Sequence, residues 1–134
     1  MDKIASFLFQ GWQWCHNFQL NPKGRIWLAW SPIAYQLSKF LTCPINLFTA
    51  SLRIYSKQFF LTFVYGYNQA EAREPLWEAL IDIAQNMDEA WCVLGDFNSV
   101  LHLGDRMGGT EVKDFEFKLF ANCNDLCNLQ ELRY

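Results

Sequence analysis

Short apolar runs that predict strands alternate along the chain with stretches in which apolar residues recur at helical spacing. The runs are rich in β-branched and aromatic residues, as strands are, and cover residues 25–30, 36–41, 47–55, 59–65 and 91–94. Short turns separate the first runs, so we expect an antiparallel meander that feeds a more central strand. Residues 1–24 read as irregular, with room for a short strand or helix.

Two segments show the period of an amphipathic helix. In residues 70–85 the apolar stripe contains Leu76, Trp77, Leu80, Ile81 and Ala84, with Arg73 at its edge. Because Pro75 fits only the first turn, this helix should start at Arg73 or Glu74. In residues 112–123 the stripe contains Val112, Phe115, Leu119, Phe120 and Cys123, and Asn124-Asp125 predicts its end. We interpret both stripes as core-facing rather than as binding surfaces.

The run Trp91-Cys-Val-Leu-Gly-Asp-Phe-Asn98 delivers an acid and an amide to the end of a strand. Its first four residues are apolar without alternation, which is typical of a strand buried on both faces, and Gly95 allows a sharp exit. In extended geometry Asp96 and Asn98 would point the same way, with Phe97 pointing into the core. The simpler alternative is an Asx-type turn that merely ends the strand.

A second polar turn, Gly66-Tyr67-Asn68, follows the strand that ends at Tyr65. The order is strand, turn, helix, strand, turn, which predicts α/β layering with parallel strands joined by a right-handed crossover. Both turns would then lie at one edge of the sheet, where ligands bind in such folds. We therefore expect Tyr65, Asn68, Asp96 and Asn98 to converge.

Four stretches of the chain resemble the endonuclease/exonuclease/phosphatase superfamily, and especially the apurinic-endonuclease-like domain of plant non-LTR (LINE-type) retrotransposons. They are Gly24-Arg-Ile-Trp-Leu-Ala-Trp30, Phe63-Val-Tyr-Gly-Tyr-Asn68, Trp91-Cys-Val-Leu-Gly-Asp-Phe-Asn98 and Asp105-Arg-Met-Gly-Gly109, in the order of the family. The resemblance implies a DNase I-like sandwich. It also implies hydrolysis of DNA phosphodiester bonds with magnesium.

The resemblance also implies roles for single residues. Asp96 matches the aspartate that orients or deprotonates the attacking water and contacts the metal, and Asn98 matches an asparagine at the scissile phosphate. Tyr65 matches the tyrosine at the phosphate and Asn68 the asparagine of the same loop. Arg106 could contact substrate, although an ion pair between Asp105 and Arg106 that fixes the loop is the simpler expectation. Such groups suit phosphoryl transfer, which depends on positioning and charge neutralisation.

Two motifs of the family do not occur in these 134 residues, namely a Glu-Thr-Lys-like metal-ligand strand and a terminal Ser-Asp-His. Neither His16 nor His102 stands in the family's setting, and each is expected to be a partly buried or surface imidazole. We therefore expect residues 1–134 to form one truncated domain of mixed sheet and two packed helices, with the second sheet largely missing. Loss of groups that act as a unit predicts that this segment alone is inactive.

Composition qualifies this interpretation. An apolar content of 51% with 17% aromatic residues is ample for a core and predicts apolar surfaces open to self-association. The formal net charge of −3, without a run of like charge, disfavours tight non-specific DNA binding, although a metal can supply positive charge. Five cysteines without zinc-site spacing predict reduced thiols, and so an intracellular, nuclear or cytoplasmic protein without a membrane span.

Three functions remain open on the sequence. The first is a truncated, inactive remnant of a retroelement endonuclease, which we favour. The second is a domesticated module that binds nucleic acid or protein without cleaving. The third is an active phosphodiesterase in which other residues replace the missing glutamate and histidine. An intact neighbouring coding context would separate domestication from decay.

Overall fold

The computed structural model describes residues 2–18, 22–43, 45–102, 104, 108 and 113–132. The chain divides into two compact units. Unit 1 contains residues 1–65 and 89–95, and unit 2 contains residues 66–88 and 96–134. The expectation of a single truncated domain over residues 1–134 stays a prediction.

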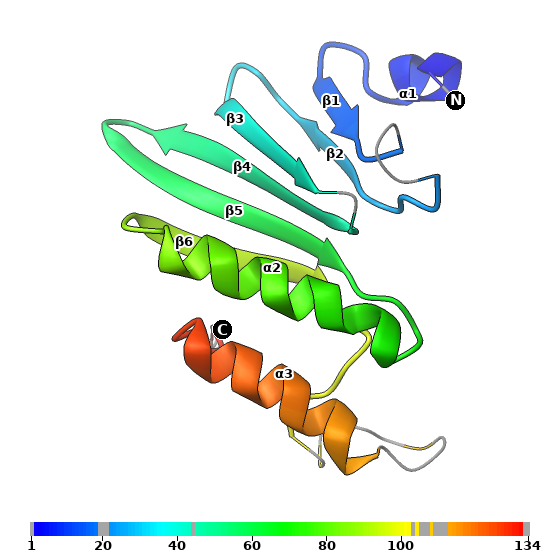
Figure 1. The fold of residues 1–134 in the computed structure, drawn as a ribbon. Coiled ribbons are helices and arrows are strands. Elements are labelled where there is room, and N and C mark those ends of the chain that lie inside the picture. Colours follow the sequence, from blue (N-terminus) through cyan, green and yellow to red (C-terminus); the bar gives the residue numbers. More distant parts are fainter. Residues whose placement is uncertain are drawn as a thin grey trace. The chain divides into compact units, whose positions relative to one another are not determined.

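Unit 1 is built from strands and one short helix (Figure 1). Helix α1 spans Asp2–Leu8, and strands β1 (Gln13–His16) and β2 (Trp27–Trp30) form an antiparallel ribbon. A four-stranded sheet has the order β3-β4-β5-β6, with β3 at Gln36–Cys43, β4 at Leu47–Ile54, β5 at Lys57–Tyr65 and β6 at Ala90–Asp96. The predicted strands are thus all present, and both a helix and a strand occur within residues 1–24.

The sheet is mixed. Strands β3, β4 and β5 form an antiparallel meander, in which β4 pairs from Leu47 opposite Val64 to Ile54 opposite Lys57. The turn of this hairpin is Tyr55-Ser56, and Tyr55 has a left-handed φ of +56°. Strands β5 and β6 run parallel, as their arrows show in Figure 1. A parallel pair needs a crossover connection, and the chain supplies it with α2 between these strands.

Strand β4 carries the core of unit 1, because Phe48 and Ala50 are buried and pack with Ile26. Several polar side chains inside the unit form hydrogen bonds with one another. Thr49 and Thr62 share a hydroxyl hydrogen bond of 2.8 Å, and Trp91 Nε1 donates to Thr62 Oγ1 at 2.8 Å. These two bonds join side chains of the adjacent strands β4, β5 and β6. They also satisfy the buried hydroxyl groups, each of which would destabilise the sheet if it had no partner.

The expectation that β6 is buried on both faces is wrong. Strand β6 is at the edge of the sheet, Trp91 to Val93 are half-buried, and Leu94 is 40% exposed. An unbroken apolar run does not distinguish an edge strand from a central one. Gly95 is also not an exit before the turn, because the strand continues to Asp96. A Cβ on Gly95 would lie 2.0 Å from the Val64 carbonyl oxygen, so the glycine permits close approach of β5 and β6.

Unit 2 contains the 3₁₀ turn η1 (Glu71–Arg73), α2 (Glu74–Gln85) and α3 (Asp114–Leu126). Helix α2 begins where Pro75 predicted it, and Leu76, Trp77 and Leu80 of its stripe are buried. The two helices pack together, with the Trp77 and Phe120 rings stacked at 4.8 Å between centroids. Burial of these large side chains contributes apolar contact that stabilises the packing of the two helices.

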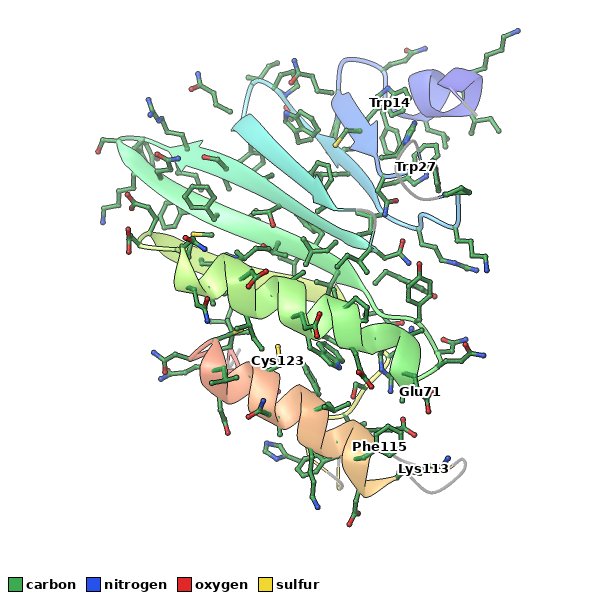
Figure 2. All side chains as sticks on the ribbon, in the orientation of Figure 1. Trp14, Trp27, Glu71, Lys113, Phe115 and Cys123 are labelled. Atoms are coloured by element: carbon green, nitrogen blue, oxygen red, sulfur yellow. The ribbon has the colours of Figure 1, made fainter. Side chains whose placement is uncertain are left out.

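Helix α3 corrects two expectations. The whole apolar stripe was expected to face the core, but only Phe120 and Cys123 of its described residues are buried, and Phe115 is 38% exposed. In Figure 2, Cys123 lies between the helices and Phe115 lies near the start of α3. The helix also continues through Asn124-Asp125 to Leu126. It ends where Asn128 adopts a left-handed φ of +51°, a conformation that asparagine tolerates at helix ends. Val112 lies outside the described residues.

The described residues therefore form a mixed α/β structure in which one sheet contains a parallel pair. No helix in the described part of the chain is long and apolar enough to cross a membrane.

Candidate functional site

The turn after β6 is held by the two residues that the sequence singles out. The backbone N–H of Asn98 donates to Asp96 Oδ1 at 2.9 Å, which defines an Asx turn. Asn98 has a left-handed φ of +47°, so the backbone is not extended at this residue. The expectation that extended geometry points the Asp96 and Asn98 side chains the same way is therefore wrong. Asp96 is exposed and Asn98 half-buried. The simpler alternative, an Asx turn, is therefore present, and it leaves the Asp96 Oδ2 oxygen outside that hydrogen bond.

Two hydrogen bonds join this turn to the loop that follows β5. The backbone N–H of Gly66 donates to the Asp96 carbonyl oxygen at 2.7 Å. The Asn98 side chain donates from Nδ2 to the Gly66 carbonyl oxygen, also at 2.7 Å. A Cβ on Gly66 would lie 2.1 Å from the Phe97 carbonyl oxygen, so only glycine allows this approach. The loop that contains Asn68 and the turn that contains Asp96 are thereby neighbours.

Arg73 holds the other side of the Gly66–Asn68 loop. Its guanidinium donates from Nη1 to the carbonyl oxygens of Tyr67, at 2.9 Å, and Asn68, at 3.1 Å. Nη2 forms an ion pair with Glu116 Oε2 at 3.0 Å. Only 2% of the Arg73 surface is exposed, so the charge is buried with three oxygen acceptors around it. The sequence placed Arg73 at the edge of a helical stripe and missed this role.

The Phe97 side chain anchors the turn by packing against aromatic rings of α2 and α3. Its ring lies 4.9 Å from the ring of Phe120 and 6.4 Å from that of Trp77, measured between centroids. The expectation that Phe97 points into a core is confirmed, and that core is the one between α2 and α3. An aromatic side chain locked by two others fixes the backbone that presents Asp96 and Asn98.

Of the two remaining predicted site residues, the structure describes Tyr65 but not Arg106. Tyr65 is the last residue of β5, half-buried, with its N–H bonded to the Asn46 carbonyl oxygen at 2.9 Å. The Arg25 guanidinium lies 5.6 Å from the centre of its ring, within cation–π range. Convergence of the Tyr65 side chain with Asp96 stays a prediction. Arg106 and Asp105 lie outside the described residues, so their contact with substrate or with each other is also untested.

A metal ion would need several oxygen ligands from this region. Within the described residues, no group of three or more histidine, cysteine, aspartate or glutamate side chains is placed to hold one. Asp96 contributes one carboxylate, and one of its oxygens already accepts the Asn98 N–H. These residues by themselves do not fit a resident metal, although Mg²⁺ can be held by one carboxylate when phosphate and water complete its shell.

The other side chains with potential chemical reactivity are the cysteines and the two histidines. The four cysteines whose side chains are described are free thiols, as expected. Burial raises the pKa of Cys15 to about 11. Burial, followed by the neighbouring Cys127 thiol, raises the pKa of Cys123 to about 12. Such thiols are poor nucleophiles and metal ligands at neutral pH. His16 is half-buried and His102 exposed, in agreement with the sequence.

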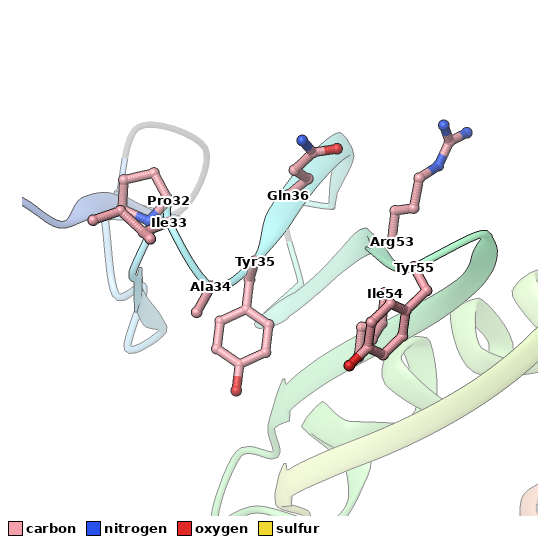
Figure 3. A pocket seen from close by; sticks show the side chains of 8 residues that line it. All are labelled: Pro32, Ile33, Ala34, Tyr35, Gln36, Arg53, Ile54 and Tyr55. Atoms are coloured by element: carbon pink, nitrogen blue, oxygen red, sulfur yellow. The ribbon is translucent and has the colours of Figure 1, made fainter.

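Unit 1 has a separate open pocket of about 390 Å³ at the β4–β5 hairpin end of the sheet (Figure 3). It is lined by Pro32, Ile33, Ala34, Tyr35, Gln36, Arg53, Ile54 and Tyr55. Ile33 and Tyr55 are 96% and 97% exposed, so this is a shallow open surface rather than an enclosed cavity. None of the predicted site residues lines it.

No protein-family model matches the chain, and no curated protein matches it significantly. The candidate site thus depends on the geometry of the chain itself.

Proposed function

We propose that residues 1–134 are the central part of a retrotransposon-type endonuclease domain with a partial DNase I-like sandwich. In this proposal the segment binds phosphodiester groups weakly at the Asp96–Asn98 turn and does not hydrolyse them on its own. The observation that carries the proposal is the pair of hydrogen bonds that brings this turn against the Gly66–Asn68 loop. These two hydrogen bonds, one between backbone groups and one from the Asn98 side chain, support the proposal that both turns contribute to one site.

The chemistry of the two turns supports phosphate rather than a neutral ligand. The Asn98 amide has a second N–H besides the one that donates to Gly66, and Asn68, two positions after Gly66, is exposed. Asp96 would repel a bare phosphate but attract its magnesium complex. With a single carboxylate, we expect Mg²⁺ to bind in the millimolar range or weaker. The proposal includes an intracellular, nuclear or cytoplasmic location, in keeping with reduced thiols.

Hydrolysis is expected to be absent because the Glu-Thr-Lys and Ser-Asp-His motifs do not occur in these residues. Groups that activate water and protonate a leaving oxygen act as a unit, so one aspartate retains little of their effect. The test is nicking of supercoiled and abasic-site DNA in magnesium. The purified chain should not exceed Asp96→Ala, with Asp88→Ala as a control for an exposed aspartate elsewhere in unit 2.

Cleavage that is abolished by Asp96→Ala and by chelator, but retained in Asp88→Ala, would overturn the inactive assignment. Binding is tested separately by NMR, following the side-chain amides of Asn68 and Asn98 during titration with a short duplex and Mg²⁺. Shifts confined to these amides and absent in Asp96→Ala are expected. If neither amide responds at millimolar magnesium, the phosphate-binding part of the proposal is wrong.

A further inference from the structure

The outer face of the β1–β2 ribbon is aromatic where a solvent-facing strand is normally polar. Cys15 and Leu28 are paired across the ribbon and pack against the core around Phe48. Because side chains alternate along a strand, Trp14, His16 and Trp27 lie on the opposite face. Core packing therefore does not account for these rings.

The rings form one connected cluster, which we call the ribbon cluster: Trp14, His16, Phe18 and Trp27. Trp14 and Trp27 stack with centroids 5.8 Å apart and ring planes 13° from parallel, as Figure 2 shows them side by side. His16 lies 5.9 Å from Trp27, and Phe18 meets Trp27 edge-on at 5.7 Å. The Phe18 N–H donates to His16 Nδ1 at 3.3 Å, which fixes the imidazole ring. Trp27 nevertheless remains 36% exposed.

The two units carry formal charges of opposite sign, although the net charge of the whole chain is only −3. By sequence, unit 1 has six lysine and arginine residues and two acidic residues, a formal charge of +4. Unit 2 has five basic and twelve acidic residues, a formal charge of −7. The expectation that charge disfavours tight non-specific DNA binding depends on this net charge and on the absence of a run of like charge. The net charge does not describe unit 1, where exposed Lys23 and Arg25 lie just before β2.

We propose that the ribbon cluster binds single-stranded nucleic acid, with unpaired bases stacking on Trp27 and the phosphates attracted by the basic residues of unit 1. Rigid aromatic rings within a positively charged surface are the features that single-strand binding requires, because every base has a face that can stack. Duplex bases are already stacked and cannot offer their faces. This activity goes beyond the proposed function, because no residue of the Asp96–Asn98 turn contributes to it.

The test is fluorescence anisotropy with 5′-labelled dT15, rU15 and a 15-base-pair duplex, with the full chain. We expect both single strands to bind more tightly than the duplex, and the affinity to fall as salt rises. Trp27→Ala should weaken single-strand binding by about 10-fold, and Trp27→Phe should restore part of it. Lys23→Glu with Arg25→Glu tests the charge contribution without removing a ring. Comparing dT15 with rU15 distinguishes DNA from RNA as the natural ligand.

Two controls keep the result specific. One is Tyr55→Ala, which removes an exposed aromatic ring elsewhere in unit 1 and should bind like the unmodified chain. Circular dichroism verifies that each variant is folded. The proposal is overturned if Trp27→Ala and the double charge variant both bind as tightly as the original chain, or if the duplex competes equally with dT15. It is equally overturned if Trp27→Ala instead dissociates a dimer, which would assign the ribbon cluster to a second copy.

Discussion

The side-chain amide of Asn98 donates from Nδ2 to the backbone carbonyl oxygen of Gly66 at 2.7 Å. One side chain thereby joins the turn after β6 to the loop after β5, although 32 positions separate them in sequence. The same residue adopts a left-handed backbone that few residue types other than glycine and asparagine tolerate. Asn98 is thus a structural residue of the candidate site whatever its role toward a ligand.

Replacing Asn98 should destabilise the protein through two separable effects. Asn98→Ala loses the bond to Gly66 and forces alanine into a left-handed conformation, so we expect a loss of about 2 kcal/mol in unfolding free energy. Asn98→Gly keeps the conformation and should lose about 1 kcal/mol. Asn128→Ala is the matched control, because Asn128 is left-handed but exposed. Urea unfolding measures all three; equal losses for Asn98→Ala and Asn128→Ala would show that the cross-loop bond contributes nothing.

Replacing Arg73 should lower the unfolding free energy more than replacing its ion-pair partner Glu116. Glu116→Gln removes the countercharge but keeps an acceptor for the buried guanidinium, so we expect a loss of about 2 kcal/mol. Arg73→Lys cannot reach the carbonyls of Tyr67 and Asn68 together with Glu116, and should lose about 3 kcal/mol. Denaturant unfolding of both single variants and the double variant gives the coupling free energy. Additive losses would mean that the two residues do not interact in solution.

The buried thiols should react slowly while the protein is folded. With a pKa of about 11 for Cys15 and about 12 for Cys123, the thiolate fraction at pH 8 falls by roughly 100-fold and 1000-fold from that of a free cysteine. Iodoacetamide labelling followed by mass spectrometry, with and without urea, measures this difference. Rapid labelling of Cys123 in the folded chain would contradict its burial.

The same thiols give stability a pH dependence of known sign. The folded pKa values lie above those of the unfolded chain, near 9. The stabilising contribution is therefore complete below pH 9 and is lost as pH rises toward the folded values, because the unfolded state releases protons first. We expect the unfolding free energy to fall between pH 9 and pH 11, and to fall less steeply in Cys123→Ala. A steeper fall in that variant would refute the assignment.

Self-association through Ile33 and Tyr55, which line the open pocket at the β4–β5 hairpin, is the last prediction. Ile33 and Tyr55 are almost fully exposed, and an aliphatic side chain gains on the order of 2 kcal/mol when it is buried at an interface. The chain should therefore associate at high concentration, and Ile33→Ser should weaken association by about 10-fold. Sedimentation velocity over a range of concentrations measures this, with Lys57→Ser as a polar control in the same hairpin. A chain that stays monomeric at high concentration would show that this surface is not an interface.

The sequence by itself determined the local elements of this protein. Pro75 marked the start of α2, the periodic apolar residues of α2 marked its buried face, and the runs that end at Tyr65 and Asp96 marked two strands. These features depend on neighbours within a few residues, so a single sequence records them. The same holds for Asp96 and Asn98, because the glycine before them and the aromatic residue between them specify a turn.

Only the tertiary structure decided what those elements face. The apolar run of β6 was compatible with a central strand, yet β6 is at an edge because it pairs with β5 alone within the described sheet. Arg73 could have been a surface cation, but Glu116 lies 43 positions away and becomes its partner only when α3 packs on α2. The ribbon cluster likewise exists only because β1 pairs with β2 in one register, which brings Trp27 opposite His16. Pairing and burial are relations between distant residues, and local pattern does not contain them.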